Sequence, residues 1–157
     1  MRILLTGASG FLGSHIAEQL DQQGAEVRAL VRPRSDTRFL DGLEHVTLVT
    51  GAMSDKDSLL AATEGVDGII HAAGLVKAKE PADFYATNEQ GTANLLDAAK
   101  RNAPDIARFV LVSSLTVMGP SQDGRPVSAG ASPNPVTHYG RSKLAAERAA
   151  RAEAHSL

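Results

Sequence analysis

Short apolar runs alternate along the chain with segments in which apolar residues recur every three or four positions. The runs are typical of buried strands and lie at 2–6, 26–31, 45–49, 67–73 and 108–114. Helices are expected between and after them, near 11–23, 54–62, 81–101 and 139–155. This alternation predicts one α/β domain over 1–157, a doubly wound (Rossmann) parallel sheet with strand order 3-2-1-4-5 and helices on both faces.

Two helices carry signals at their ends. Gly24 is expected to end the first helix as a C-cap. Three apolar side chains are expected on the buried face of that helix: Leu12, Ile16 and Leu20. Ser54 and Asp57 have the spacing of a capping box for the second helix. The proline-rich segment 119–137 predicts a long loop, and long ordered loops are often functional.

Composition narrows the classes of function. The net charge of −2 and the absence of a basic cluster argue against nucleic-acid binding. The chain has no cysteine, which excludes disulfides and thiolate metal sites, and its five histidines are scattered, so no metal site is expected. No apolar run approaches the roughly 20 residues of a membrane span. We therefore expect a cytoplasmic protein.

A glycine-rich stretch, "LLTGASGFLGSH", joins the first strand to the first helix. Gly7 permits a sharp turn, Gly10 lets the backbone approach a pyrophosphate, and Gly13 lets the helix pack on the strand. The helix N-terminus adds free N–H groups and a positive dipole. The residues expected to bind a dinucleotide here are Gly7, Ser9, Gly10, Phe11, Leu12 and Gly13.

Three segments in this order, "TGASGFLG", "SSLTVMG" and "YGRSK", resemble the extended short-chain dehydrogenase/reductase family, also called NAD-dependent epimerase/dehydratase. The resemblance covers essentially the whole chain. It implies a nicotinamide dinucleotide cofactor and reactions that begin with hydride transfer. "VRALVRPRSD", with an arginine after the second strand, resembles the dihydroflavonol-reductase-like branch.

The end of the second strand bears on the choice of cofactor. NAD-preferring folds usually place an acidic residue there, but this chain has Val31 followed by Arg32. An arginine can bind a 2′-phosphate through two hydrogen bonds, which favours NADP(H) over NAD(H). The alternative is a solvated basic loop.

Two further segments are expected to line the cofactor. After the third strand the family commonly has a Gly-Asp pair whose Asp contacts adenine, but this chain has Ala52 there. Met53 is then expected to contact the base through its backbone or its side chain. After the fourth strand, "HAAG" resembles the family's cofactor-lining segment and adds His71, Ala72 and Ala73. The side chain of His71 is more typical of a structural role than a catalytic one.

Tyr139 and Lys143 are the expected catalytic pair. Their i, i+4 spacing places both on one helical face. A tyrosine alone is a poor base because its reference pKa is about 10, but a nearby ammonium stabilises the phenolate. Tyr139 would exchange the proton of the substrate hydroxyl, and Lys143 would also bind the cofactor ribose. The alternative is a packed tyrosine ring beside a surface lysine.

The resemblance adds two further catalytic residues. Ser114, after the fifth strand, aligns with the family's catalytic Ser/Thr, with Thr116 as the alternative. Strand alternation turns Ser113 the other way, and it is expected to contact the cofactor. Asn88 matches a helix asparagine that helps to organise the family's active site.

These residues predict a reductase, or an epimerase or dehydratase, of a small-molecule substrate, with the reductase slightly favoured. A non-catalytic NAD(P)-binding sensor is the alternative. By resemblance we expect a homodimer through the helices near 82–101 and 139–155. The family's substrate-binding part follows the catalytic helix, so we expect this chain to be the cofactor-binding part of a longer protein, possessing little turnover by itself.

Overall fold

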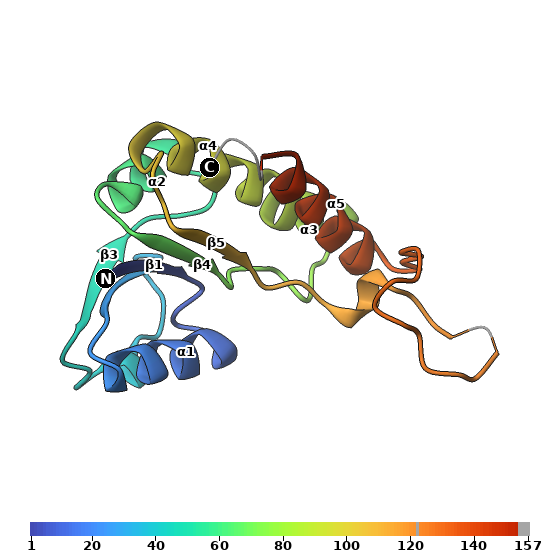
Figure 1. Ribbon diagram of the computed structural model, residues 1–157, viewed down its shortest axis with the longest axis horizontal. Coiled ribbons are helices and arrows are strands. Elements are labelled where there is room, and N and C mark those ends of the chain that lie inside the picture. Colours follow the sequence, from blue (N-terminus) through green and yellow to red (C-terminus); the bar gives the residue numbers. More distant parts are fainter. Residues whose placement is uncertain (122, 154–157) are drawn as a thin grey trace.

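The computed structural model describes residues 1–121 and 123–153. Five parallel strands form one sheet: β1 (Arg2–Thr6), β2 (Glu26–Val31), β3 (Val46–Thr50), β4 (Gly68–His71) and β5 (Arg108–Leu111). Their order, β3-β2-β1-β4-β5, confirms the predicted doubly wound sheet (Figure 1). β4 and β5 end earlier than predicted, because the chain leaves the sheet there and continues as loops along the carboxyl edge.

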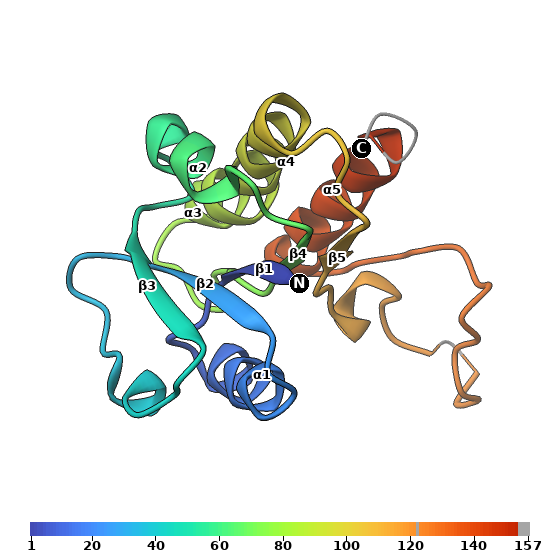
Figure 2. The ribbon, with the colours of Figure 1, turned by 60° about the vertical axis from the view of Figure 1, so that its left-hand side comes forward.

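Helices cover both faces of the sheet (Figure 2). One face carries α1 (Phe11–Gln22) and the 3-10 helix η1 (Arg38–Leu40), and the other carries α2 (Lys56–Thr63), α4 (Gly91–Asn102) and α5 (His138–Glu153). Successive side chains of β1 point to opposite faces of the sheet and so contribute to the core on both faces. Leu5 packs with Ala17 beneath α1, whereas Leu4 packs with Leu59 and Leu95 beneath α2 and α4, and all five are fully buried. The core therefore has two halves, divided by the sheet.

The ends of α1 confirm one prediction and correct another. Gly24 follows the helix with a φ of 69°, and its N–H bonds to Asp21 O at 2.9 Å, as expected of a glycine cap. Leu12, however, is 49% exposed and does not lie on the buried face. The helix approaches the sheet through the small residues Gly13, Ser14 and Ala17, so its inward face is centred one residue later than predicted.

The N-terminus of α2 also differs from the prediction by one residue. Its cap is Asp55, whose carboxylate accepts from Ser58 N at 3.2 Å, and not the Ser54–Asp57 pair. The three-residue spacing is the same in both pairs. The structure selects Asp55 because Ala52 N donates to Ser58 Oγ, which holds Ser58 in the first turn.

The helix predicted at 81–101 is divided into three pieces. α3 (Pro81–Phe84) leads into the π-helix η2 (Tyr85–Gln90), which α4 continues. The wider π turn lies where Asn88 is buried and bonded to a neighbouring loop. Because π turns interrupting α-helices often mark functional sites, η2 is a candidate part of the site.

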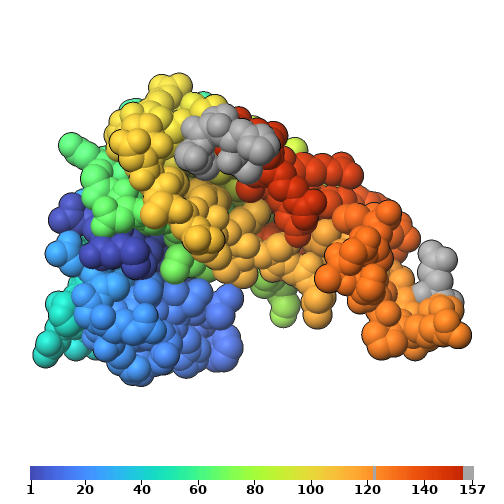
Figure 3. Space-filling view, viewed as in Figure 1, coloured from blue at the N-terminus to red at the C-terminus, as the bar shows by residue number. Residues whose placement is uncertain are grey.

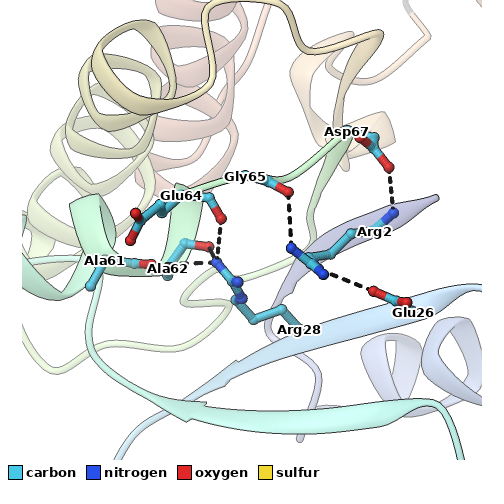
Figure 4. A network of polar contacts seen from close by, with 8 residues as sticks. All are labelled: Arg2, Glu26, Arg28, Ala61, Ala62, Glu64, Gly65 and Asp67. Carbon is cyan, nitrogen blue, oxygen red and sulfur yellow. Dashed lines mark hydrogen bonds and ion pairs between the residues drawn. The ribbon is translucent and has the colours of Figure 1, made fainter.

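Two arginines from neighbouring strands hold the turn between α2 and β4 (Figure 4). Arg28 donates through Nη1 to the carbonyls of Ala62 and Glu64, at 2.7 Å and 2.8 Å. These carbonyls lie at the end of α2, where a cation offsets the helix dipole. Arg2 donates its backbone N–H to the Asp67 carboxylate at 2.6 Å. Arg28 thereby holds the end of α2 against the sheet, and Arg2 holds the start of β4.

The chain between the 3-10 helix η3 (Leu115–Val117) and α5 forms the predicted loop. Its part after residue 122 projects away from the body, as the space-filling view shows in orange (Figure 3). Within the residues that the structure describes, no helix combines the length and the apolar character that crossing a bilayer requires.

Candidate active site

An open pocket of about 410 Å³ lies at the carboxyl edge of the sheet. Its walls come from the glycine loop, the end of β2, the loop after β3, the loop after β4 and η2. The predicted cofactor residues that line it are Gly7, Ser9, Gly10, Arg32, Met53, Ala72 and Ala73. This is the position at which doubly wound sheets bind ligands.

The three glycines of the first loop have distinct roles. Gly7 has a φ of 75°, and a Cβ there would lie 2.6 Å from Ala73 N. A Cβ on Gly13 would lie 2.0 Å from Gly7 O, so the helix packs backbone to backbone against the turn. A Cβ on Gly10 would meet only Gly7 O, at 3.3 Å, and would otherwise extend into open space. Gly10 alone therefore leaves room for a ligand.

The N-terminus of α1 is open beside this loop. Gly10 caps the helix without a side-chain hydrogen bond, so among residues 1–121 and 123–153 no capping side chain accepts from the first N–H groups. The side chains of Phe11 and Leu12 are exposed, and their backbone N–H groups belong to this first turn. A glycine cradle against an unsatisfied helix N-terminus fits a pyrophosphate.

Of two arginines that follow β2, Arg32 lines the pocket and Arg38 is paired with a neighbouring carboxylate. Arg32 lines the pocket, and within residues 1–121 and 123–153 its side chain forms no hydrogen bond or ion pair. Its backbone closes a tight turn with Ser35, whose Oγ accepts from Arg32 N at 3.2 Å. Arg38 instead donates hydrogen bonds to Asp36, with Arg38 Nη2 2.7 Å from Asp36 Oδ2. These side-chain hydrogen bonds hold the pKa of Asp36 at about 2, so Arg38 is committed to a local pair.

The loop after β3 is held by α4. Met53 O accepts from Asn94 Nδ2 at 3.0 Å, and a Cβ on Gly91 would lie 2.9 Å from the Met53 Cβ. Ala52 lines the pocket without a polar side chain. This wall therefore offers a ligand an apolar surface, backbone groups and Ser54.

The loop after β4 presents Ala72 and Ala73 to the pocket, whereas the His71 side chain lies behind it, 1% exposed. Both imidazole nitrogens are bonded, Nδ1 to Thr6 Oγ1 at 2.6 Å and Nε2 to Thr92 Oγ1 at 3.0 Å. Burial, assisted by the charge of Lys143, lowers the pKa of His71 to about 3. The ring is neutral near pH 7 and belongs to the framework behind the pocket.

Tyr139 and Lys143 lie one turn apart at the start of α5. Tyr139 is half-buried with its ring beside Phe84, at a centroid distance of 6.1 Å. Lys143 is 4% exposed, and in the described part of the chain its ammonium forms no hydrogen bond or ion pair. Burial lowers the pKa of Lys143, and the charge of Glu147 opposes that shift.

The ammonium of Lys143 faces the pocket wall. A Cβ on Gly74, a pocket-lining residue, would lie 3.8 Å from Lys143 Nζ. Among the described residues, every fully enclosed polar side-chain atom has a hydrogen-bond partner. Because Lys143 Nζ has no such partner, it is not fully enclosed and remains accessible from open space. Lys143 is thus a buried cation available to a ligand, and not a surface lysine beside a tyrosine.

The two serines that follow β5 bond to different partners. Ser113 Oγ donates to the Glu147 carboxylate on α5, which ties the end of β5 to the helix of Tyr139. Ser114 Oγ accepts from Thr116 N at 3.2 Å and from Thr116 Oγ1 at 2.9 Å. Its own proton remains available to a substrate oxygen.

The segment that carries Ser114 packs directly against the catalytic helix. A Cβ on Gly140 would lie 2.7 Å from Thr116 O, a contact that only glycine allows. η3 and the first turn of α5 are therefore in close contact, and Ser114 comes to the same region as Tyr139.

Asn88 lies 1% exposed at the centre of the site, in η2. Its amide bonds both backbone polar atoms of Leu75 and also Ser142 Oγ, at 2.9 Å. Ser142 lies between Tyr139 and Lys143 in the sequence, so Asn88 connects the loop after β4 with the catalytic helix.

Sequence reasoning missed several residues of the site. Thr6 and Ser35 line the pocket, and Ser142 and Thr92 supply buried hydrogen bonds. Thr6 had a detectable signal, because it is a polar residue at the end of an apolar strand. Thr92 had none for its bond to His71, which lies 21 residues away and becomes its neighbour only in the fold.

No group of three or more potential ligands among residues 1–121 and 123–153 is arranged to hold a metal ion.

Known proteins are similar to this chain in sequence and in fold. The model of the NAD dependent epimerase/dehydratase family matches residues 3–156. The chain is similar to a ceramide reductase of Caulobacter vibrioides, being 36% identical over 150 residues, which make up 96% of this chain and 42% of the relative.

Solved structures agree in fold. A putative epimerase from Burkholderia cenocepacia matches with a TM-score of 0.88 and 32% identity over 99% of this chain and 51% of its own. A short-chain dehydrogenase/reductase superfamily protein from Agrobacterium tumefaciens, solved with bound NAD, matches with a TM-score of 0.83 and 31% identity over 99% and 46%. The chain spans about half the length of these proteins. It belongs to the NAD dependent epimerase/dehydratase family.

Proposed function

We propose that this chain forms the dinucleotide-binding part of an oxidoreductase that transfers hydride between NADP(H) and a carbonyl or hydroxyl group of a small molecule. The observation that carries the proposal is Lys143, a buried ammonium without a partner in the described chain, beside the pocket-lining Gly74. Burying an unpaired cation is costly, so a lysine kept there for structure alone would have a carboxylate partner.

We propose the following roles for the residues that the site brings together. Nicotinamide supplies or accepts the hydride when it is bound. In reduction, Tyr139 gives its phenolic proton to the substrate oxygen as the carbonyl carbon gains hydride, and in oxidation it takes the proton back. Lys143 stabilises the phenolate and bonds the ribose, while Ser114 donates a hydrogen bond to the substrate oxygen. Asn88 organises the site through Leu75 and Ser142.

The cofactor preference rests on the end of β2. Arg32 lines the pocket, and the Ser35 hydroxyl stands in the same turn where an acidic residue would select NAD. A 2′-phosphate would find there a guanidinium and a hydroxyl, which favours NADP(H). The rest of the predicted binding set, including Phe11, Leu12, Gly13 and Ser113, would act through backbone groups or through the packing of the walls.

Reductase chemistry is our first choice and epimerase or dehydratase chemistry the second, in line with the predicted dihydroflavonol-reductase-like branch. The ceramide reductase supports the first and the putative epimerase the second. A non-catalytic sensor would need neither the phenol of Tyr139 nor the ammonium of Lys143.

We also propose a cytoplasmic homodimer. α4 and α5 pack side by side, and α5 keeps small, half-buried residues, Ala145 and Ala149, on its surface. Residues 154 and 155 of the predicted dimer helix lie outside the described part. Light scattering at micromolar concentration tests the dimer, and a monomeric mass contradicts it.

The test of the function has two steps. Fluorescence titration with NADPH measures binding to this chain. Absorbance of NADPH then follows turnover of ketones and UDP-sugars by this chain and by a form extended through its natural downstream sequence. We expect binding by both and turnover by the extended form. Binding without turnover on any substrate would favour the sensor, and no binding would end the proposal.

A further inference from the structure

A buried polar chain runs behind the pocket and is centred on His71. The imidazole lies between Thr6 of β1, 2.6 Å from Nδ1, and Thr92 of α4, 3.0 Å from Nε2. Phe109 of β5 packs edge-on against the ring, with centroids 6.3 Å apart. The histidine thus joins two strands and a helix, and nothing in the proposed chemistry uses its proton.

The hydrogen bonds of Thr92 determine which ring nitrogen is protonated. Thr92 Oγ1 lies 2.6 Å from Asn88 O, which can only accept. Thr92 therefore gives its single proton to that carbonyl and must accept from His71 Nε2. Nε2 consequently carries a hydrogen.

The other side of the ring follows from its charge. Burial, with a smaller contribution from the Lys143 charge, lowers the pKa of His71 to about 3, so the ring is neutral and Nδ1 is bare. Thr6 Oγ1 must then donate to Nδ1, and its lone pair accepts the N–H of Ala73 at 3.2 Å. The hydroxyls of Thr6 and Thr92 therefore each donate one hydrogen bond and accept one.

The same series of hydrogen bonds continues to the catalytic helix through Asn88. The Asn88 side chain donates to Ser142 Oγ at 2.9 Å, and Ser142 Oγ donates to Tyr139 O at 2.8 Å. Ala73 lines the pocket, and Tyr139 begins α5. A set of buried and partly buried hydrogen bonds therefore links the pocket wall to the backbone of the proposed proton donor.

We propose that His71 is a positioning residue that, as its Nε2–H tautomer, fixes the pocket wall at Ala73 relative to the helix of Tyr139 through Thr92 and Asn88. Its effect on turnover rests on the proposed hydride transfer. Its tautomer and its structural coupling are properties of the described residues and are independent of any substrate.

The first test is NMR of the chain labelled with ¹⁵N at histidine. We expect His71 to show a protonated Nε2 and a bare Nδ1, without change between pH 5 and pH 9 in the range that a free histidine would titrate. An Nδ1–H tautomer, or a charged ring within that range, overturns the proposal.

The second test removes the acceptor of the Nε2 proton in Thr92→Val, with Thr92→Ser as the matched control that keeps the hydroxyl. In the valine variant we expect the ring to switch to Nδ1–H. Amide exchange at Ala73 and Leu75 should accelerate together with exchange in the first turn of α5, by about tenfold or more. The serine variant should keep the native tautomer and exchange rates.

A native tautomer in Thr92→Val, or faster exchange confined to α4, overturns the coupling. If this variant does not fold, the tautomer of the unmodified chain still decides the first claim, and Thr6→Ser against Thr6→Val repeats the exchange test from the other side of the ring.

In the extended enzyme, Thr92→Val should lower kcat about 10- to 100-fold while the dissociation constant of NADPH changes less than about threefold, because the reacting groups are displaced and the pocket remains. Equal losses in kcat and in affinity indicate general damage and contradict positioning. Absence of turnover in the unmodified enzyme would count against the proposed function alone, since both NMR tests remain.

Discussion

The side-chain amide of Asn88 pairs with both backbone polar atoms of Leu75, accepting from Leu75 N at 2.7 Å and donating to Leu75 O at 3.0 Å. Because the same amide also donates to Ser142 Oγ, three segments distant in sequence meet at one buried residue. Asn88 therefore holds the pocket-lining loop after β4 against the catalytic helix. The π-helix around Asn88 is the local backbone form that accompanies this arrangement.

Replacing Asn88 by alanine should destabilise the fold. Leu75 N, Leu75 O and Ser142 Oγ would each lose a partner inside the protein, and one buried unsatisfied group costs about 1–3 kcal/mol. Urea unfolding should show a loss of at least that size. Asn102→Ala is the matched control, since that exposed amide makes one bond, to Leu60 O. Equal, small losses in both variants would contradict the bridging role.

The glycine loop should tolerate alanine at one position and not at another. In Gly10→Ala the new methyl meets only Gly7 O, so the fold should persist while dinucleotide affinity falls about tenfold or more. In Gly13→Ala the methyl would lie 2.0 Å from Gly7 O, so the midpoint of thermal unfolding should fall. Circular dichroism and NADPH titration separate the two effects, and a stable Gly13→Ala that binds normally would refute this assignment.

Arg32 and Arg38 should differ in their effect on cofactor choice. Arg32→Ala should weaken NADPH binding about 10- to 100-fold and leave NADH within about twofold, because only the 2′-phosphate contact is lost. Arg38→Ala should change neither, since that guanidinium is held by Asp36. Tighter binding of NADH than NADPH by the unmodified chain would reverse the proposed preference.

Acid should destabilise the chain partly through His71. Its pKa falls from 6.5 to about 3 on folding, so the unfolded chain binds the extra proton between these values and stability declines as the pH falls through this window. Between pH 7 and pH 5 the His71 contribution is about 2 kcal/mol. Urea unfolding of His71→Gln should lack this part of the pH dependence, and His45→Gln, an exposed control, should retain it. Identical pH dependence in the two variants would show that His71 is not the group responsible.

Most of the fold could be predicted from the sequence because buried parallel strands are continuous apolar runs and surface helices have a regular period. The strand order and both helical layers are as predicted. The errors have local causes. Leu12 was placed inward because hydrophobicity alone defined the face, whereas contact with the sheet is made through the small residues Gly13 and Ala17.

The site was predictable where chemistry depends on neighbours in sequence, and not where it depends on the fold. The i, i+4 spacing of Tyr139 and Lys143 is a property of a helix. That Lys143 is buried and has no partner among the described residues, or that Ser113 bonds Glu147, follows from the packing of α5 against η2, α4 and η3. No pattern in the sequence brings Thr6, His71 and Thr92 together, because each lies on a different element.

The most direct test of the account is Tyr139→Phe in the extended form of the protein. The ring that packs beside Phe84 is retained and only the phenolic proton is lost. We predict that NADPH binds within about threefold of the unmodified affinity, and that turnover falls by about 100-fold or more, because general acid–base transfer contributes about 10²–10⁴-fold. Turnover of Tyr139→Phe comparable with that of the unmodified enzyme, on any substrate, would contradict the central claim that Tyr139 moves the proton.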